Sequence, residues 1–143
     1  MFIDSRPHLH CMKTGHRPHI LVVEDNTDTQ LLLQHLLRAD HEVTVRSSVQ
    51  DAIAASRQER FDLVLLDINL GEELTGIDVL EEIRAQSLDR HIPAIAMTAY
   101  AMPGDRERFL ELGFSAYLSK PFSRALLLTC IERVLTTIRL KKC

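Results

Sequence analysis

The sequence lacks the marks of several protein classes. No apolar run approaches the roughly 20 residues that a membrane-spanning helix needs. The formal net charge is −3, so the basic excess that favours nucleic-acid binding is missing, and we expect no nucleic-acid partner. The first residues, MFIDSRPHLHCMKTGHRPH, contain no apolar segment of the kind that directs secretion. These absences predict a cytoplasmic globular protein with no membrane partner.

Cysteine is also scarce. Cys11, Cys130 and Cys143 are odd in number and scattered, which is typical of free thiols in a reducing compartment. The histidines of the first 18 residues stand among prolines and polar residues without a repeated ligand spacing, so this segment is predicted to be a flexible leader. The rest of the 143-residue chain has the size of one domain, which we place at 19–140, followed by a tail at 141–143.

Within this domain, short apolar runs alternate with longer segments of helical period. This alternation predicts a doubly wound α/β fold in which a parallel sheet of five strands is covered by five helices. Three strands are continuously apolar, as expected where helices cover both faces, whereas residues 41–46 alternate and suit an edge. The predicted strands are HILVVED (19–25), HEVTVR (41–46), FDLVLLD (61–67), IPAIAMT (92–98) and FSAYLSK (114–120).

Residues that favour helix ends mark the five helices. Thr27 and Gln30 form a capping-box pattern at the first helix, and Thr75 with Asp78 repeats that pattern at the third. Gly113 is predicted to end the fourth helix. The other predicted start signals are Ser47 or Ser48 as the cap of the second helix, Pro103 in the first turn of the fourth, and Ser123 as the cap of the last.

Polar side chains stand at the carboxyl ends of four predicted strands. They are Glu24 and Asp25, Asp67, Thr98, and Lys120, which precedes the strand-breaking Pro121. Right-handed crossovers bring these strand ends to one edge of the sheet, where ligands of open α/β sheets bind. Each residue alone could be a turn former or a solvated strand end, but together they predict a functional site.

The charges at this edge indicate a chemistry. Two carboxylates about 4 Å apart repel by about 4 kcal/mol at an effective dielectric of about 20, so three of them need cations. Lys120 supplies one cation, and an open site of carboxylates suits Mg²⁺ as the other. A carboxylate beside Mg²⁺, a hydroxyl and a lysine is suited to phosphoryl transfer, with Asp67 as the attacking group and as the partner of Lys120.

Four motifs resemble those of the receiver domains of two-component response regulators, the family typified by the chemotaxis protein CheY. They are VVEDN (22–26), LLDINL (65–70), AMTAY (96–100) and YLSKPF (117–122), and the resemblance runs from about residue 19 to 139. It implies a flavodoxin-like sheet with strand order 2-1-3-4-5. The segment from Thr98 to Phe122 is also similar to receivers attached to, or served by, hybrid histidine kinases.

The resemblance implies a role for each residue of the site. Asp67 would accept a phosphoryl group from a histidine kinase or a histidine phosphotransfer protein. Asp25, Asp67 and the backbone carbonyl of Asn69 would bind Mg²⁺ or Mn²⁺, with Glu24 acting through water. The protein would be a signalling module that gains and loses its phosphoryl group rather than a turnover enzyme.

The remaining implied roles concern switching. Thr98 would hydrogen-bond the phosphoryl group, Lys120 would pair with it, and the Tyr117 ring would turn inward when Thr98 moves. The Lys120–Pro121 bond would be cis. Ala99 would leave room for the phosphoryl group, while Asn69 and Tyr100 occupy positions that tune the lifetime of the phosphorylated state. Only RLKKC follows the last predicted helix, so we expect the output to be an unknown downstream protein that binds the fourth helix, fifth strand and fifth helix.

One departure and two alternatives accompany this interpretation. Gly71 stands where the family usually has a proline, and the GEELTG loop is about one residue longer. A haloacid-dehalogenase-type phosphatase would need a second aspartate two residues after the nucleophile, and that position is Asn69. An inactive receiver-like scaffold would not need the complete set of site residues.

Overall fold

The computed structural model describes residues 17–69, 76–99 and 101–142 and shows a five-stranded parallel sheet. The strand order is β2-β1-β3-β4-β5, which confirms the predicted order and the edge position of β2. The strands are β1 (His19–Val23), β2 (Glu42–Arg46), β3 (Leu63–Asp67), β4 (Ala94–Thr98) and β5 (Ala116–Ser119).

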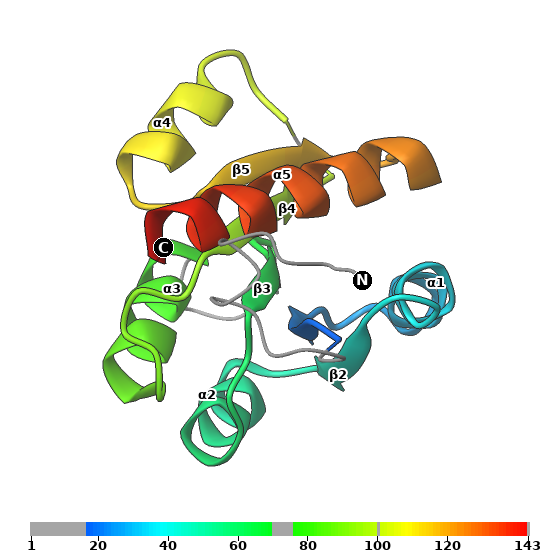
Figure 1. Cartoon of the computed structure of the whole chain (residues 1–143). Coiled ribbons are helices and arrows are strands. Elements are labelled where there is room, and N and C mark those ends of the chain that lie inside the picture. The colour runs from blue at the N-terminus through cyan, green and yellow to red at the C-terminus, as the bar shows by residue number, and fades with distance from the viewer. Residues whose placement is uncertain (1–16, 70–75, 100, 143) are drawn as a thin grey trace.

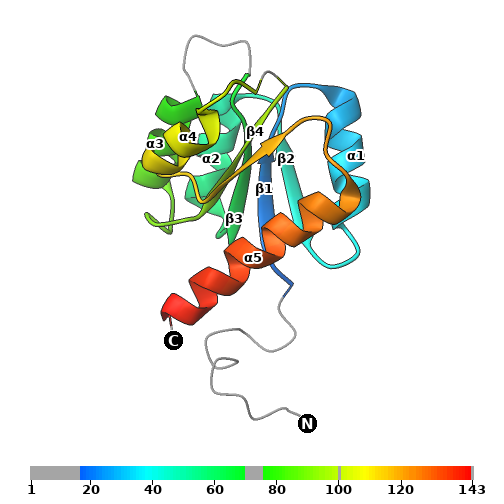
Figure 2. The ribbon, with the colours of Figure 1, turned by 90° about the horizontal axis from the view of Figure 1, so that it is seen from above.

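Helices cover both faces of this sheet, as Figures 1 and 2 show. One layer holds α1 and α5, and the other holds α2, α3 and α4. The helices are α1 (Thr27–Leu37), α2 (Val49–Gln58), α3 (Gly76–Gln86), α4 (Asp105–Glu111) and α5 (Arg124–Lys142). The predicted doubly wound fold is therefore confirmed.

The two layers explain the apolar strand sequences. Along β1, Leu21 and Val23 pack toward the α2 and α3 layer, whereas Ile20 and Val22 pack toward α1 and α5. Every residue of β3 and β4 is buried. Because successive side chains of a strand point to opposite faces, a strand covered on both sides needs apolar residues at nearly every position. This packing fixes where each strand ends, and with it the positions of the polar residues.

Two predicted helix starts are corrected. Asn26, not Thr27, caps α1, since its side chain accepts a hydrogen bond of 2.9 Å from the Thr29 N–H. Gln30 instead donates to the backbone carbonyl of Glu24 and, over 3.0 Å, to Ser47. Pro103 precedes α4 rather than lying in its first turn, because Gly104 occupies the N-cap position in the left-handed region.

Other helix ends agree with the sequence patterns. Ser48 caps α2 and Ser123 accepts from the Leu126 N–H at the start of α5, so both predictions are confirmed. Gly113 follows the end of α4 with φ of +108°. The predicted cap at Thr75 lies outside the described residues, as do residues 71–75 of the GEELTG loop.

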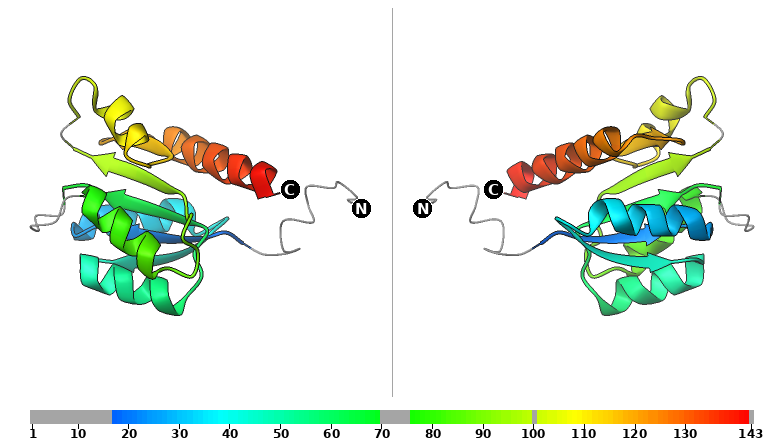
Figure 3. Two further views of the ribbon diagram at one scale, coloured as in Figure 1. Left: turned by 90° about the vertical axis from the view of Figure 1, so that its left-hand side faces the viewer. Right: turned by 90° about the vertical axis from the view of Figure 1, so that its right-hand side faces the viewer.

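The last helix extends beyond the predicted end of the domain. α5 continues to Lys142, past the expected domain end at residue 140, and its last turns lie at the end of the molecule from which β1 starts (Figure 3). No helix of the described residues combines the length and apolar character needed to cross a membrane.

Candidate functional site

The carboxyl edge of the sheet gathers the acidic residues predicted from the sequence. Glu24 follows β1 and Asp67 ends the neighbouring β3, and both are buried, whereas Asp25 is exposed. One carboxylate oxygen from each of the three lies within 4.8 Å of the others. The pairing of β1 with β3 therefore brings together carboxylates that are more than 40 residues apart in the sequence.

Lys120 follows β5, at the edge of the sheet opposite β2, and its side chain reaches the same cluster. The backbone N–H of Lys120 donates to the backbone carbonyl of Thr98 over 2.7 Å, and the Lys120–Pro121 peptide bond is cis. The ammonium lies 2.6 Å from Glu24 Oε1 and 3.3 Å from Asp67 Oδ2. Sequence reasoning expected Asp67 as the partner of this lysine and missed the closer contact with Glu24.

Burial and mutual repulsion shape the electrostatics of the cluster. The pKa of Glu24 is raised because burial, aided by its hydrogen bond with Asp67, outweighs the opposite effect of Lys120. Burial acts to lower the pKa of Lys120, but its hydrogen bond to Glu24 and the charge of Asp67 prevail, so that pKa is raised. The single ammonium thus does not balance the carboxylates.

Asn69 joins Asp67 to the hydroxyl at the end of β4. The Asn69 N–H donates to Asp67 Oδ1 over 2.9 Å, and its side-chain amide donates to Thr98 Oγ1 over 2.7 Å. Thr98 is 1% exposed, while Asn69 is exposed. No sequence pattern indicated the contact between Asn69 and Thr98, because it depends on the side-chain rotamers of a residue after β3 and of the last residue of β4.

The aromatic residue expected to switch lies on β5, toward α4. The Tyr117 ring stacks on Phe109 with a centroid distance of 5.5 Å, and its hydroxyl donates to Asp105 Oδ2 over 3.4 Å. Burial and the neighbouring Asp105 raise the pKa of Tyr117. Ala99 is exposed directly after β4, and the position of Tyr100 lies outside the described residues.

The acidic cluster fits a hard divalent cation. Its donors are carboxylate oxygens, which Mg²⁺ prefers, and Lys120 brings one ammonium to three carboxylates. Asp25 is exposed, so a cation bound there would keep water molecules among its ligands, as Mg²⁺ commonly does. The residues present therefore suit such an ion.

The fold and this edge together define a class of protein. A parallel sheet of order 2-1-3-4-5 carries an acidic pair, a central buried aspartate, a hydroxyl and a lysine at one end. That combination is typical of a CheY-like receiver domain. The sequence matches the response regulator receiver domain over residues 20–132, and the chain belongs to this family.

Named relatives agree with this assignment. The chain is 40% identical over 105 residues to the polar-differentiation response regulator DivK of Brucella anthropi, covering 73% of this chain and 85% of DivK. The receiver domain of the sensor histidine kinase PA1611 of Pseudomonas aeruginosa is 38% identical with a TM-score of 0.74, covering 85% and 99% of the two chains. That structure holds a magnesium ion in its active-site cleft.

A third relative supports the fold. The CheY-like response regulator receiver domain protein of Methanospirillum hungatei has a TM-score of 0.78 and 27% identity, with coverage of 90% of this chain and all of the other. The four short motifs that resemble those of receiver domains therefore predicted the family correctly.

Proposed function

We propose that Asp67 accepts a phosphoryl group from the phosphohistidine of a histidine kinase or a histidine phosphotransfer protein. The observation that carries this proposal is the position of the Asp67 carboxylate, which has an oxygen within 4.8 Å of oxygens of both Glu24 and Asp25 and lies 3.3 Å from the Lys120 ammonium. Membership in the receiver family supports it. The protein then acts as a signalling module in a phosphorelay, not as a turnover enzyme, and the cytoplasm remains the predicted compartment.

The chemistry follows from the residues at the edge. One oxygen of Asp67 attacks the phosphorus, so a P–O bond forms while the P–N bond to the donor histidine breaks and its electron pair returns to the imidazole. Lys120 and the Thr98 hydroxyl stabilise the charge on the transferred group. Asp25, Asp67 and the Asn69 carbonyl would hold Mg²⁺ or Mn²⁺, with Glu24 acting through water; when bound, the cation supplies charge neutralisation at the phosphoryl oxygens.

A small phosphodonor tests this step directly. With Mg²⁺ and acetyl phosphate, the wild-type chain should gain the mass of one phosphoryl group, and hydroxylamine should remove it. Asp67→Asn should gain none, whereas Asp62→Asn, which alters an aspartate at the opposite end of β3, should be modified like the wild type. Modification of Asp67→Asn at the wild-type rate would refute the assignment.

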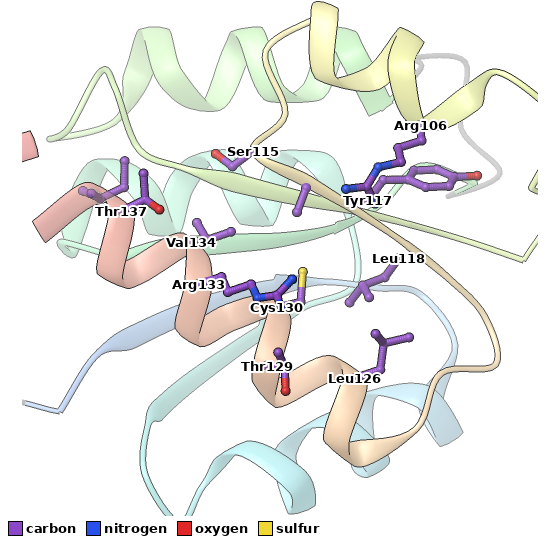
Figure 4. A pocket seen from close by; sticks show the side chains of 12 residues that line it. Arg106, Ser115, Tyr117, Leu118, Leu126, Thr129, Cys130, Arg133, Val134 and Thr137 are labelled. Atoms are coloured by element: carbon purple, nitrogen blue, oxygen red, sulfur yellow. The ribbon is translucent and has the colours of Figure 1, made fainter. Parts of the chain in front are cut away.

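The output surface is proposed to be formed by α4, β5 and α5. A groove with a volume of about 400 Å³ lies there, and its walls include Tyr117 of β5 and Cys130 of α5 (Figure 4). Because Tyr117 packs on Phe109 and bonds Asp105, any movement of its ring changes both α4 and this groove. The switch is therefore connected to the surface by direct contacts.

The charges of this groove indicate the chemistry of the downstream partner. Arg106 reaches in from α4 and Arg133 from α5, and neither guanidinium has an ion pair or hydrogen bond with the described part of the chain (Figure 4). Apolar walls are formed by Leu126 and Val134. We infer a partner segment that places carboxylates beside an apolar side chain.

Peptide selection tests the partner chemistry. A random peptide library selected against the beryllofluoride-treated chain should be enriched in peptides that combine Asp or Glu with large apolar residues. Their binding should fall in Arg106→Ala/Arg133→Ala and persist in Arg57→Ala, which alters an exposed arginine of α2. Enrichment of basic or uncharged peptides, or equal binding to all three chains, would contradict the inference.

A further inference from the structure

The side-chain amide of Asn69 contacts the hydroxyl that the proposed switch must move. It donates to Thr98 Oγ1 over 2.7 Å, while the backbone N–H of the same residue donates to Asp67 Oδ1 over 2.9 Å. The family resemblance implies that the Asn69 carbonyl binds the metal and that this position affects the lifetime of the phosphorylated state. The amide contact is an additional link, between the phosphoacceptor side and the hydroxyl side of the site.

This bond constrains where the Thr98 oxygen can be. A threonine hydroxyl has one donor hydrogen and two acceptor lone pairs, and here one lone pair is used by the amide. Threonine is branched at Cβ and occupies discrete staggered rotamers, so its oxygen moves between separate positions rather than drifting. An amide that binds the oxygen in one rotamer therefore favours that rotamer over the others.

We propose that the Asn69 amide is a latch that holds Thr98 in the arrangement of the unphosphorylated protein and releases it when Asp67 is phosphorylated. The proposal rests on the proposed function, since it concerns the same switch. On phosphorylation, the hydroxyl turns toward the new phosphoryl oxygens and donates to them, and the contact with Asn69 is lost. Asn69 is thus a positioning residue that acts through Thr98.

The latch has a defined thermodynamic effect. A hydrogen bond that is made in only one of two states changes the free-energy difference between them by the net free energy of that bond. For a neutral hydrogen bond, that strength corresponds to a factor of about two to ten in an equilibrium constant. Removing the amide should therefore make the unphosphorylated protein switch more readily, without adding any contact to the phosphorylated state.

The exposure of Asn69 separates this role from a general role in folding. Asn69 is exposed, so replacing its side chain removes no packing from the core, and water can take the place of the amide beside the Thr98 hydroxyl. The backbone N–H that binds Asp67 remains in any substituted chain other than proline. Asn69→Ala should therefore fold normally.

Beryllofluoride binding at saturating Mg²⁺ tests the latch as an equilibrium. Beryllofluoride mimics the phosphoryl group, and its dissociation constant can be followed by the fluorine NMR signal of the bound group, which does not depend on movement of Thr98. Asn69→Ala should bind it about twofold to tenfold more tightly than the wild type. In a Thr98→Val background, where the acceptor oxygen is missing, the same substitution should have no effect.

The outcomes distinguish the latch from the proposed function. If the wild type fails to bind beryllofluoride, the proposed function is contradicted. If the wild type binds but Asn69→Ala binds equally or more weakly, only the latch is wrong. An effect of Asn69→Ala that persists in the Thr98→Val background would also overturn it. In the wild type, the Asn69 side-chain amide protons should exchange faster once beryllofluoride is bound, and unchanged exchange would count against release.

Discussion

The ammonium of Lys120 lies closer to Glu24 than to Asp67, at 2.6 Å against 3.3 Å. Glu24 is fully buried, so this pair lies largely out of water, and the lysine is shared between two carboxylates. A phosphoryl group on Asp67 would offer new oxygens to the same ammonium. The position of Lys120 thus links the acidic pair to the proposed phosphoacceptor before any transfer occurs.

Neutralising Glu24 should stabilise the metal-free protein. The pKa of Glu24 is raised by burial and by Asp67, so the folded state holds its proton more tightly than the unfolded state does. The stability that the folded state gains from binding this proton is fully present below the ordinary pKa of 4.5. It is lost as the pH rises through the higher pKa of the folded state. Glu24→Gln, which resembles the protonated form, should therefore be more stable than the wild type at pH 7 in EDTA.

Chemical denaturation at several pH values measures this effect. The stability difference between Glu24→Gln and the wild type should shrink as the pH falls toward 4.5, because the wild-type carboxyl becomes protonated as well. Glu42→Gln, at an exposed position of the edge strand β2, serves as the control. A Glu24→Gln chain that is less stable than the wild type at pH 7 would show that the ion pair with Lys120 outweighs the burial of the carboxylate.

Mg²⁺ should raise the thermal stability of the wild-type protein. A ligand that binds only the folded state at 100 times its dissociation constant stabilises it by about 2.7 kcal/mol. Asp25→Asn should lose most of this gain, whereas Asp28→Asn, three residues further along the chain in α1, should retain it. Thermal melts with matched ionic strength provide the measurement, and equal melting temperatures with and without Mg²⁺ would argue against the metal site.

Thr98→Val should separate phosphorylation from output. Valine keeps the shape of threonine but removes the hydroxyl. Asp67 should therefore still be phosphorylated, while the output surface of α4, β5 and α5 should not change. Amide exchange with and without beryllofluoride should change across α4, β5 and α5 in the wild type and change little in the variant. Wild-type changes confined to α1 and α2 would place the output surface elsewhere.

Gly113→Ala should destabilise the fold by more than Gly104→Ala does. Both glycines have positive φ, which costs an alanine about 1–2 kcal/mol. A Cβ at Gly113 would also lie 2.9 Å from Arg84 Nη1, whereas a Cβ at Gly104 would meet nothing within 4 Å. Arg84 donates to the carbonyls of Ile92 and Gly113 and cannot move without disturbing those bonds. Urea unfolding of the two variants makes the comparison, and equal losses would show that Arg84 adapts freely.

Much of this protein is determined by the sequence pattern alone. The apolar runs ILVV and LVLL predict strands covered on both faces, and parallel strands connected by right-handed crossovers must end at one edge. From this, Glu24, Asp67 and Lys120 could be placed together without coordinates. The pattern succeeds because burial and chain connectivity act over whole segments and tolerate small errors in where an element begins.

The tertiary structure decided the individual contacts. Asn26 and Thr27 are both suitable helix caps, and only the path of the chain after Glu24 selects Asn26. Whether Lys120 lies nearer Glu24 or Asp67 depends on less than an ångström, and the two partners are 96 and 53 residues away in the sequence. The bond between Asn69 and Thr98 likewise requires the segment after β3 and the end of β4 to meet with particular rotamers. Such contacts depend on packing between segments that are far apart in the sequence, so local residue patterns do not predict them.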